Sequence, residues 1–88
     1  MKVFVITNQS LYPDSSYYDA VGVASTYEGA KAMVDNFAKN FRDAVERNEY
    51  SESFTDIVTF EDDNEVRIED ECTGYFEQWN ITEHEVMP

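Results

Sequence analysis

One amphipathic helix pattern, flanked on both sides by strand patterns, is the feature that most limits how this chain can fold. From Ala30 onward the apolar residues recur at spacings of three, four and seven, which predicts a helix that buries one stripe. Ser25 and Glu28 have the spacing of a capping box, so we expect the helix to begin there and to end near Asn48. The expected buried stripe is Ala30, Val34, Phe37, Phe41 and Val45.

The segments around this helix are rich in β-branched and aromatic residues and predict strands. The predicted strands are residues 2–7, 17–24, 56–62, 65–71 and 75–86. Residues 8–16 are polar and read as a loop that joins the first two strands into a hairpin. With 88 residues the chain has room for one core, so residues 1–88 are predicted to form a single acidic domain.

The expected fold class is therefore α+β, a mainly antiparallel sheet of about five strands in the order β-β-α-β-β-β, with one long helix on one face. One helix leaves the second face of such a sheet uncovered. We expect that face to expose residues such as Phe4 or Ile6, or to be covered by the Tyr-rich loop or by a second subunit.

The charge is strongly negative and unevenly distributed. The chain carries 19 acidic and 6 basic residues, for a formal net charge of -13. Residues 1–47 contribute 6 acids and 5 bases, whereas residues 48–88 contribute 13 acids and 1 base. A protein that binds nucleic acid or an anionic membrane directly needs clustered Lys and Arg, so both classes are excluded.

The acidic second half supplies most candidates for a partner-binding site. On a strand, Glu65, Arg67, Glu69 and Glu71 would project from one face at intervals of about 6.6–6.8 Å, with Val66 and Ile68 facing the core. Such a carboxylate row is similar to the charge row of a nucleic-acid backbone. The candidate carboxylates are Glu61, Asp62, Asp63, Glu65, Glu69, Asp70, Glu71 and Glu77. The alternative interpretation is a solvated face that only keeps the protein soluble.

Aromatic residues provide a second set of candidate contacts. Tyr and Trp are the residue types that anchor interfaces, so Tyr12, Tyr17 and Tyr18 are candidate contact residues, with core packing as the alternative. For Trp79 we expect core packing.

Neither catalysis nor metal binding is predicted. The segment that begins at Asp62 lacks the ligand and glycine positions of an EF-hand loop, and Cys72 is the only cysteine. His84 has no Ser or Cys partner apparent in the sequence. We therefore expect no catalytic residue, metal or cofactor. The first apolar run, residues 3–6, is too short for a signal-peptide core or a membrane span, which predicts a cytoplasmic protein.

Three short motifs resemble a group of small uncharacterised bacteriophage proteins. These are the opening Lys-Val-Phe-Val at residues 2–5, the Gly-Val-Ala-Ser-Thr junction at residues 22–26 and the acidic close Glu-His-Glu-Val at residues 83–86. That group begins with a Lys-Val-aromatic-Val strand, has a Gly-Val-x-Ser-Thr junction before its helix and ends in a Glu-x-Glu-Val strand. Ala24 stands where the group usually has an aromatic residue. The resemblance implies a phage origin and a fold, but no catalytic residue.

Two functional hypotheses follow. The first is a non-catalytic phage-type protein of the anti-CRISPR or anti-restriction kind. It would inhibit a host nucleic-acid-handling or defence protein in the host cytoplasm by presenting a nucleic-acid-mimicking acidic surface to the basic nucleic-acid-binding surface of that protein. The second is an accessory or structural phage protein, a homodimer joined through the uncovered sheet face, whose acids only confer solubility.

Overall fold

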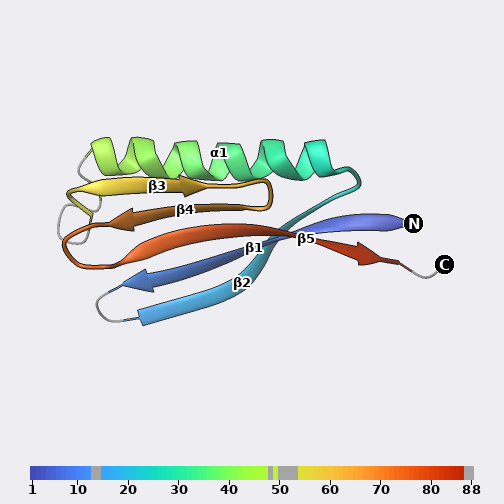
Figure 1. The fold of residues 1–88 in the computed structure, drawn as a ribbon, viewed down its shortest axis with the longest axis horizontal. Coiled ribbons are helices and arrows are strands. Elements are labelled where there is room, and N and C mark those ends of the chain that lie inside the picture. The colour runs from blue at the N-terminus through green and yellow to red at the C-terminus, as the bar shows by residue number, and fades with distance from the viewer. Residues whose placement is uncertain (13–14, 48, 50–53, 87–88) are drawn as a thin grey trace.

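The computed structural model describes residues 1–12, 15–47, 49 and 54–86. It has one antiparallel five-stranded sheet with one helix, in the order β-β-α-β-β-β predicted from the sequence. The elements are β1 (Lys2–Tyr12), β2 (Ser15–Ala24), α1 (Tyr27–Glu46), β3 (Ile57–Glu61), β4 (Glu65–Asp70) and β5 (Phe76–Glu85). The strands lie side by side in the order β2-β1-β5-β4-β3 (Figure 1). The molecule is elongated, with extents of 47 × 22 × 19 Å.

The first hairpin is much longer than predicted. Residues 8–12 and 15–16 continue β1 and β2 instead of forming a loop, with Asn8 paired to Asp19 and Tyr12 paired to Ser15. Polar side chains stay in the sheet because they find partners in β5. Asn8 donates to the carbonyl of Gln78 at 3.1 Å, and the Ser10 hydroxyl donates to Glu77. Polar composition therefore predicted a loop incorrectly here, because hydrogen bonds to β5 compensate for the burial of these polar groups.

The helix packs its apolar stripe across one face of the sheet. The buried helix residues are Ala30, Val34, Ala38, Phe41 and Ala44. Phe37 and Val45, which were predicted to be buried, are only partly buried and flank the core. Three small alanines alternate with Val34 and Phe41 along this buried stripe. Trp79 packs as a core residue, as predicted, with its ring centroid 6.1 Å from that of Phe41.

The predicted capping box is wrong by one residue. The N-cap is Thr26, whose Oγ1 accepts a hydrogen bond from the N–H of Gly29 at 3.0 Å. Ser25 precedes the cap, and Glu28 lies in the first turn, where a carboxylate interacts favourably with the positive end of the helix dipole.

The sheet face opposite α1 is open, but the residues on it are not the predicted ones. Phe4 and Ile6 face the helix and belong to or pack against the core. Because strand residues alternate between the two faces, Val3 and Val5 lie on the open face instead. One row crosses all five strands on this open face: Tyr18, Gln9, Gln78, Arg67 and Phe60.

The middle of that row is covered by polar side chains. The Arg67 guanidinium lies 3.9 Å from the ring centroid of Phe76 and donates to Oε1 of Gln78 at 3.2 Å. Gln78 is consequently only 8% exposed although no helix covers it. The centre of the open face is thus a layer of hydrogen-bonded amides and one arginine.

The position of the N-cap can be checked by mutation. Thr26→Ala should lower the free energy of unfolding by about 1 kcal/mol, because the Gly29 N–H loses its acceptor. Ser25→Ala should change it by less than about 0.5 kcal/mol. Urea denaturation of both variants measures the difference. An equal or larger loss of unfolding free energy in Ser25→Ala would show that Ser25 is the N-cap.

Candidate functional site

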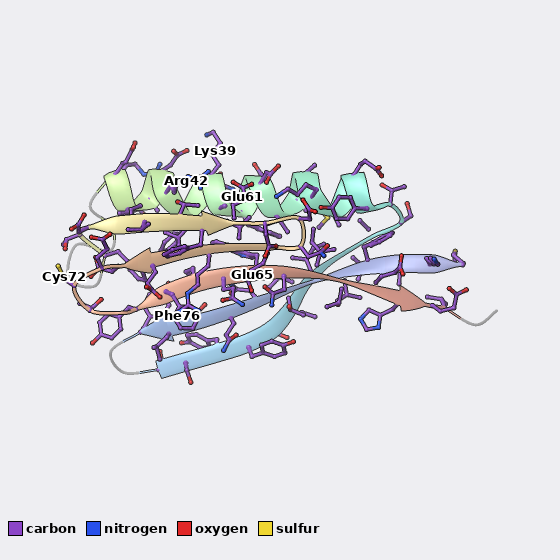
Figure 2. The ribbon with its side chains drawn as sticks, in the orientation of Figure 1. Lys39, Arg42, Glu61, Glu65, Cys72 and Phe76 are labelled. Atoms are coloured by element: carbon purple, nitrogen blue, oxygen red, sulfur yellow. The ribbon has the colours of Figure 1, made fainter. Side chains whose placement is uncertain are left out.

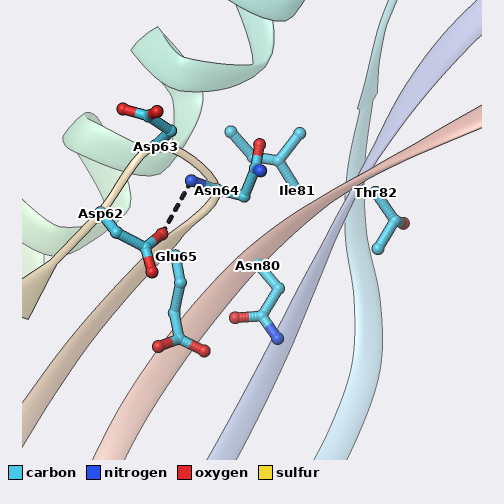
Figure 3. Close-up of a pocket in the computed structure, with 7 residues that line it drawn as sticks. All are labelled: Asp62, Asp63, Asn64, Glu65, Asn80, Ile81 and Thr82. Atoms are coloured by element: carbon cyan, nitrogen blue, oxygen red, sulfur yellow. Dashed lines mark hydrogen bonds between the residues drawn. The ribbon is translucent and has the colours of Figure 1, made fainter.

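The turn between β3 and β4 carries four carboxylates within five residues, of which Glu61, Asp62 and Asp63 are exposed and Glu65 is half-buried. Its backbone is closed by the Asp62 N–H, which donates to the Glu65 carbonyl at 2.9 Å. The N–H of Asn64 donates to Oδ1 of Asp62 at 2.9 Å, an Asx turn that fixes the Asp62 side chain (Figure 3). We refer to Glu61, Asp62, Asp63 and Glu65 as the acidic turn.

Three contacts tie the acidic turn to the rest of the fold. The Tyr27 hydroxyl at the start of α1 donates to the carbonyl of Asp63. The N–H of Ile81 in β5 donates to the carbonyl of Asn64 at 2.8 Å. Lys31 of α1 forms an ion pair with Glu61 at 3.1 Å, and Figure 2 shows Glu61 beside the helix. The turn is therefore held between the helix and the middle strand of the sheet.

The carboxylates of the acidic turn point in different directions. Asp63 is directed away from Glu65, whereas Glu65 lies beside the Asn80 amide on the open face (Figure 3). A shallow open groove of about 450 Å³ runs past these residues and continues over Asn64, Ile81 and Thr82. Lys31 neutralises Glu61, so Asp62, Asp63 and Glu65 remain as charges without an ion pair to a described residue.

The expected carboxylate row on β4 is interrupted. Arg67 lies between Glu65 and Glu69 and pairs with Glu69, with Nη2 and Oε1 2.6 Å apart. Glu65 and Glu69 are four residues apart, which is about 13 Å along a strand. Glu71 lies beyond the end of β4, where its N–H donates to the Asp56 carbonyl at 3.0 Å. The structure thus leaves one local cluster at the turn in place of a regular row.

Asp70 has a structural position and is not accessible to a partner. It is fully buried on the helix face of β4. Oδ1 accepts from the N–H groups of Thr55 and Asp56 at 2.9 and 2.8 Å, and Oδ2 accepts from the N–H and hydroxyl of Thr73. The Asp56 N–H above all, with the Thr55 and Thr73 donors, lowers the pKa of Asp70 to about 2. This carboxylate joins the start of β3 to the turn after β4.

Glu77 is also buried and does not contribute to the acidic surface. Only 7% of it is exposed, and it accepts hydrogen bonds from the hydroxyls of Ser10 and Tyr12. None of the described cationic groups lies within ion-pair distance of it. Burial raises the pKa of Glu77 in spite of these hydrogen bonds. Glu77 lies on the helix face of β5, the same face as Trp79 and Ile81, because residues two apart on a strand point to the same side. The two-residue spacing of these positions is visible in the sequence.

The three candidate tyrosines are divided between core and surface. Tyr12 is partly buried, donates to Glu77 at 3.2 Å and meets the Phe54 ring edge-on with centroids 5.6 Å apart. Tyr17 and Tyr18 are 59% and 70% exposed on β2. Because β2 and the acidic turn lie on opposite sides of the sheet order, these tyrosines do not join the acidic turn in one patch.

The acids at the chain ends are paired. Glu83 lies 3.7 Å from the Lys2 ammonium, and Glu85 lies 3.2 Å from the N-terminal amine. His84 Nε2 is 3.0 Å from the Thr82 hydroxyl, and Cys72 is an exposed free thiol. Sequence reasoning missed Tyr27 and Lys31 as neighbours of the acidic turn, because they lie 36 and 30 residues before their partners and no local pattern marks them.

Within the described ranges, no three His, Cys, Asp or Glu side chains gather closely enough to hold a metal ion. The helix that the structure describes is not apolar enough to cross a membrane. Comparison of the chain with protein-family models, with curated proteins and with solved structures found no significant match.

Replacement of Asp70 should destabilise the fold. In Asp70→Asn the amide nitrogen faces the N–H of Thr73, so a part-buried donor loses its charged acceptor at a cost of about 1–2 kcal/mol. The depressed pKa means that the stabilisation by Asp70 is present above its ordinary pKa of 3.8 and is lost as the pH falls toward 2. Acid and urea denaturation measure both effects. Asp56→Asn, at an exposed carboxylate, is the control, and equal losses in the two variants would contradict this role.

Replacement of Glu77 should stabilise the fold, whereas replacement of Asp70 should destabilise it. A raised native pKa means that the native state holds the proton more tightly, so stability is lost as the pH rises through that pKa. The Ser10 hydroxyl donates to Oε1 and the Tyr12 hydroxyl to Oε2, so Glu77→Gln keeps one acceptor oxygen, offers an N–H donor to the other hydroxyl and removes the buried charge. We expect its advantage in melting temperature over the native chain to grow between pH 4.5 and 7. A constant difference across this range would show that Glu77 does not titrate there.

Proposed function

We propose that this protein is a non-catalytic binding protein that docks its acidic turn against the basic nucleic-acid-binding surface of a host protein. In this role the carboxylates occupy positions that phosphates of the nucleic acid would take. The observation that carries the proposal is the acidic turn itself, in which three unneutralised carboxylates surround a backbone held by Tyr27, Asn64 and Ile81.

Rigidity of the acidic turn favours binding. Side chains and backbone that are ordered before association lose less conformational entropy in the complex. Asp62 is already fixed by the Asn64 N–H, and the Asp63 backbone is held by Tyr27. The turn therefore presents its charges at a fixed place, as a nucleic-acid backbone does.

The field of the whole molecule supports the same role. Residues 48–88 carry 13 acids and 1 base, and the strands they form lie together on one side of the sheet order. A one-sided negative field attracts a cationic surface over a distance and raises the association rate. The field also repels DNA and RNA, so the expected partner is a protein.

The resemblance to small bacteriophage proteins makes a host nucleic-acid-handling or defence protein the natural partner class. A phage protein of the anti-CRISPR or anti-restriction kind meets its target in the host cytoplasm. Occupying the nucleic-acid site would block the target without any catalytic step.

A second candidate function is an accessory or structural phage protein whose acids only confer solubility. The observation that favours it is the number of acids already engaged in ion pairs. Glu61, Glu69, Glu83 and Glu85 each have a cationic partner within 4.0 Å, which reduces the charge available to a binding partner. This function predicts that exposed acids can be replaced anywhere on the surface with equal effect.

A pull-down from bacterial lysate with a matched pair of variants separates the two functions. Asp63→Lys/Glu65→Lys changes the acidic turn, and Glu46→Lys/Asp56→Lys changes exposed acids elsewhere. Each double variant adds four units of charge and takes the net charge from -13 to -9. We expect the turn variant alone to slow association with the captured partner by about tenfold or more.

Two further readouts belong to this experiment. Mimicry requires that a duplex oligonucleotide displaces the captured partner and that high salt weakens the complex. If the native chain retains no nucleic-acid-handling protein at low salt, or if both double variants lose the partner equally, the acidic turn is not the binding site.

A further inference from the structure

The edge strand β2 is long, exposed and nearly uncharged. It forms one end of the sheet order, with β1 on one side and no strand on the other in the described part of the chain. Eight of its ten residues are exposed, including Val23 at 61%. An edge strand presents unpaired N–H and C=O groups, and proteins commonly protect such edges with Lys, Pro or several charges. The sequence of β2 contains neither Lys nor Pro, and Asp19 is its only charged residue.

The opposite edge of the sheet is protected. β3 has five residues against the ten of β2. It is flanked by Asp56 and ends at Glu61 in the acidic turn, so charge stands at both of its ends. Short length and flanking charge are two of the usual ways to prevent edge-to-edge pairing. The two edges therefore differ in their readiness to accept another strand.

The direction of the β2 amides that are not paired to β1 follows from the hydrogen bond of Ala20. Its N–H donates to Oδ1 of Asp19 at 2.9 Å, so it points away from β1. N–H groups alternate between the two sides of an antiparallel strand, so those of Tyr18 and Ser16 point away from β1 as well. The outward amides are thus Ser16, Tyr18 and Ala20, which are symmetric about Tyr18.

We propose that β2 pairs in antiparallel orientation with β2 of a second copy of this chain, with Tyr18 on the two-fold axis. Tyr18 then pairs with Tyr18 of the second copy, and Ser16 pairs with Ala20 of the second copy on each side. The two five-stranded sheets join into one continuous sheet of ten strands. The pairing ends at the bulge, where Val21 has no partner in β1 between the Ala20 and Gly22 pairs.

The surroundings of β2 leave room for this contact. The start of β2 lies on the side of the molecule away from α1 (Figure 1). Only its end is under the helix, where an added Cβ on Gly22 would come within 2.5 Å of Met33 Cε. The segment from Ser16 to Ala20 is therefore open to another strand along its whole length.

The charge distribution favours a second copy as the occupant. In the ten-stranded sheet the β3 strands of the two copies are nine strand spacings of about 4.8 Å apart, or about 43 Å. This exceeds the Debye length of about 8 Å at physiological salt, so the acidic turns of two copies repel each other weakly in this arrangement. A strongly basic partner, by contrast, finds only Asp19 to attract it to β2. The inference stands on β2 alone and is independent of the proposed function.

A matched pair of variants tests the contact. Tyr18 and Phe60 lie at opposite ends of the same cross-strand row, on the open face, and are 70% and 52% exposed. Tyr18→Lys places two like charges opposite each other at the axis, whereas Phe60→Lys places the same charge at the other edge. Sedimentation velocity over a concentration series should give a dimer for the native chain and for Phe60→Lys. Tyr18→Lys should weaken dimerisation by about tenfold.

A third variant tests the role of Asp19. Asp19→Ala frees the Ala20 N–H and removes two like charges near the axis, so the dimer should become tighter by about fivefold. Hydrogen exchange then gives the register, because the amides of Ser16, Tyr18 and Ala20 should become protected as the concentration rises.

Three results would overturn the inference. One is that the native chain and Asp19→Ala both stay monomeric through the whole series. The second is that Phe60→Lys weakens the dimer as much as Tyr18→Lys. The third is a dimer in which the Ser16 and Tyr18 amides exchange as fast as in the monomer.

Discussion

One helix of 20 residues provides most of the cover that the described sheet receives, with Phe54 completing the core beside Phe41, and that constraint shapes the molecule. The core lies between α1 and the helix face of β1, β5 and β4, and the other face remains in contact with water. The middle of this water-facing side is covered by the polar side chains of Gln78, Asn80 and Arg67 and not by a second apolar layer. Strongly apolar exposure is left mainly at the two edges, at Val23 and Phe60.

The acidic residues divide into groups with different physical roles. Asp70 is buried but surrounded by backbone donors, so its charge stabilises the junction of β3 and β4. Glu77 is buried, and desolvation outweighs its hydrogen bonds to neutral side chains, so its charge opposes folding. Acids such as Glu69 and Glu85 are neutralised by neighbours. Net charge alone therefore overstates the acidic surface, because several acids are buried or ion-paired, whereas Asp62 and Asp63 in the β3–β4 turn are exposed without an ion pair to a described residue.

Most of the helix and strand assignments could be predicted from the periodicity of apolar residues. The three-and-four spacing around Val34 and the alternation around Val66 each arise from local geometry, so the helix and the strand order along the chain could be predicted. The loop expected at residues 8–16 could not, because its strand character depends on Ser10 meeting Glu77 from the far end of the chain. The candidate site was harder still. Alternation alone did not reveal that Arg67 would neutralise Glu69 or that Tyr27 would hold the acidic turn.

The middle strand of the sheet, β5, comes last in chain order. The two hairpins, β1 with β2 and β3 with β4, are each local, and in the described sheet β5 is the strand that pairs with both of them. During synthesis the sheet therefore remains two separate halves until residues 76–85 emerge and insert between them. Closure depends on contacts such as Lys2 with Glu85, which span nearly the whole chain, and such long-range closure is the slow kind of folding step.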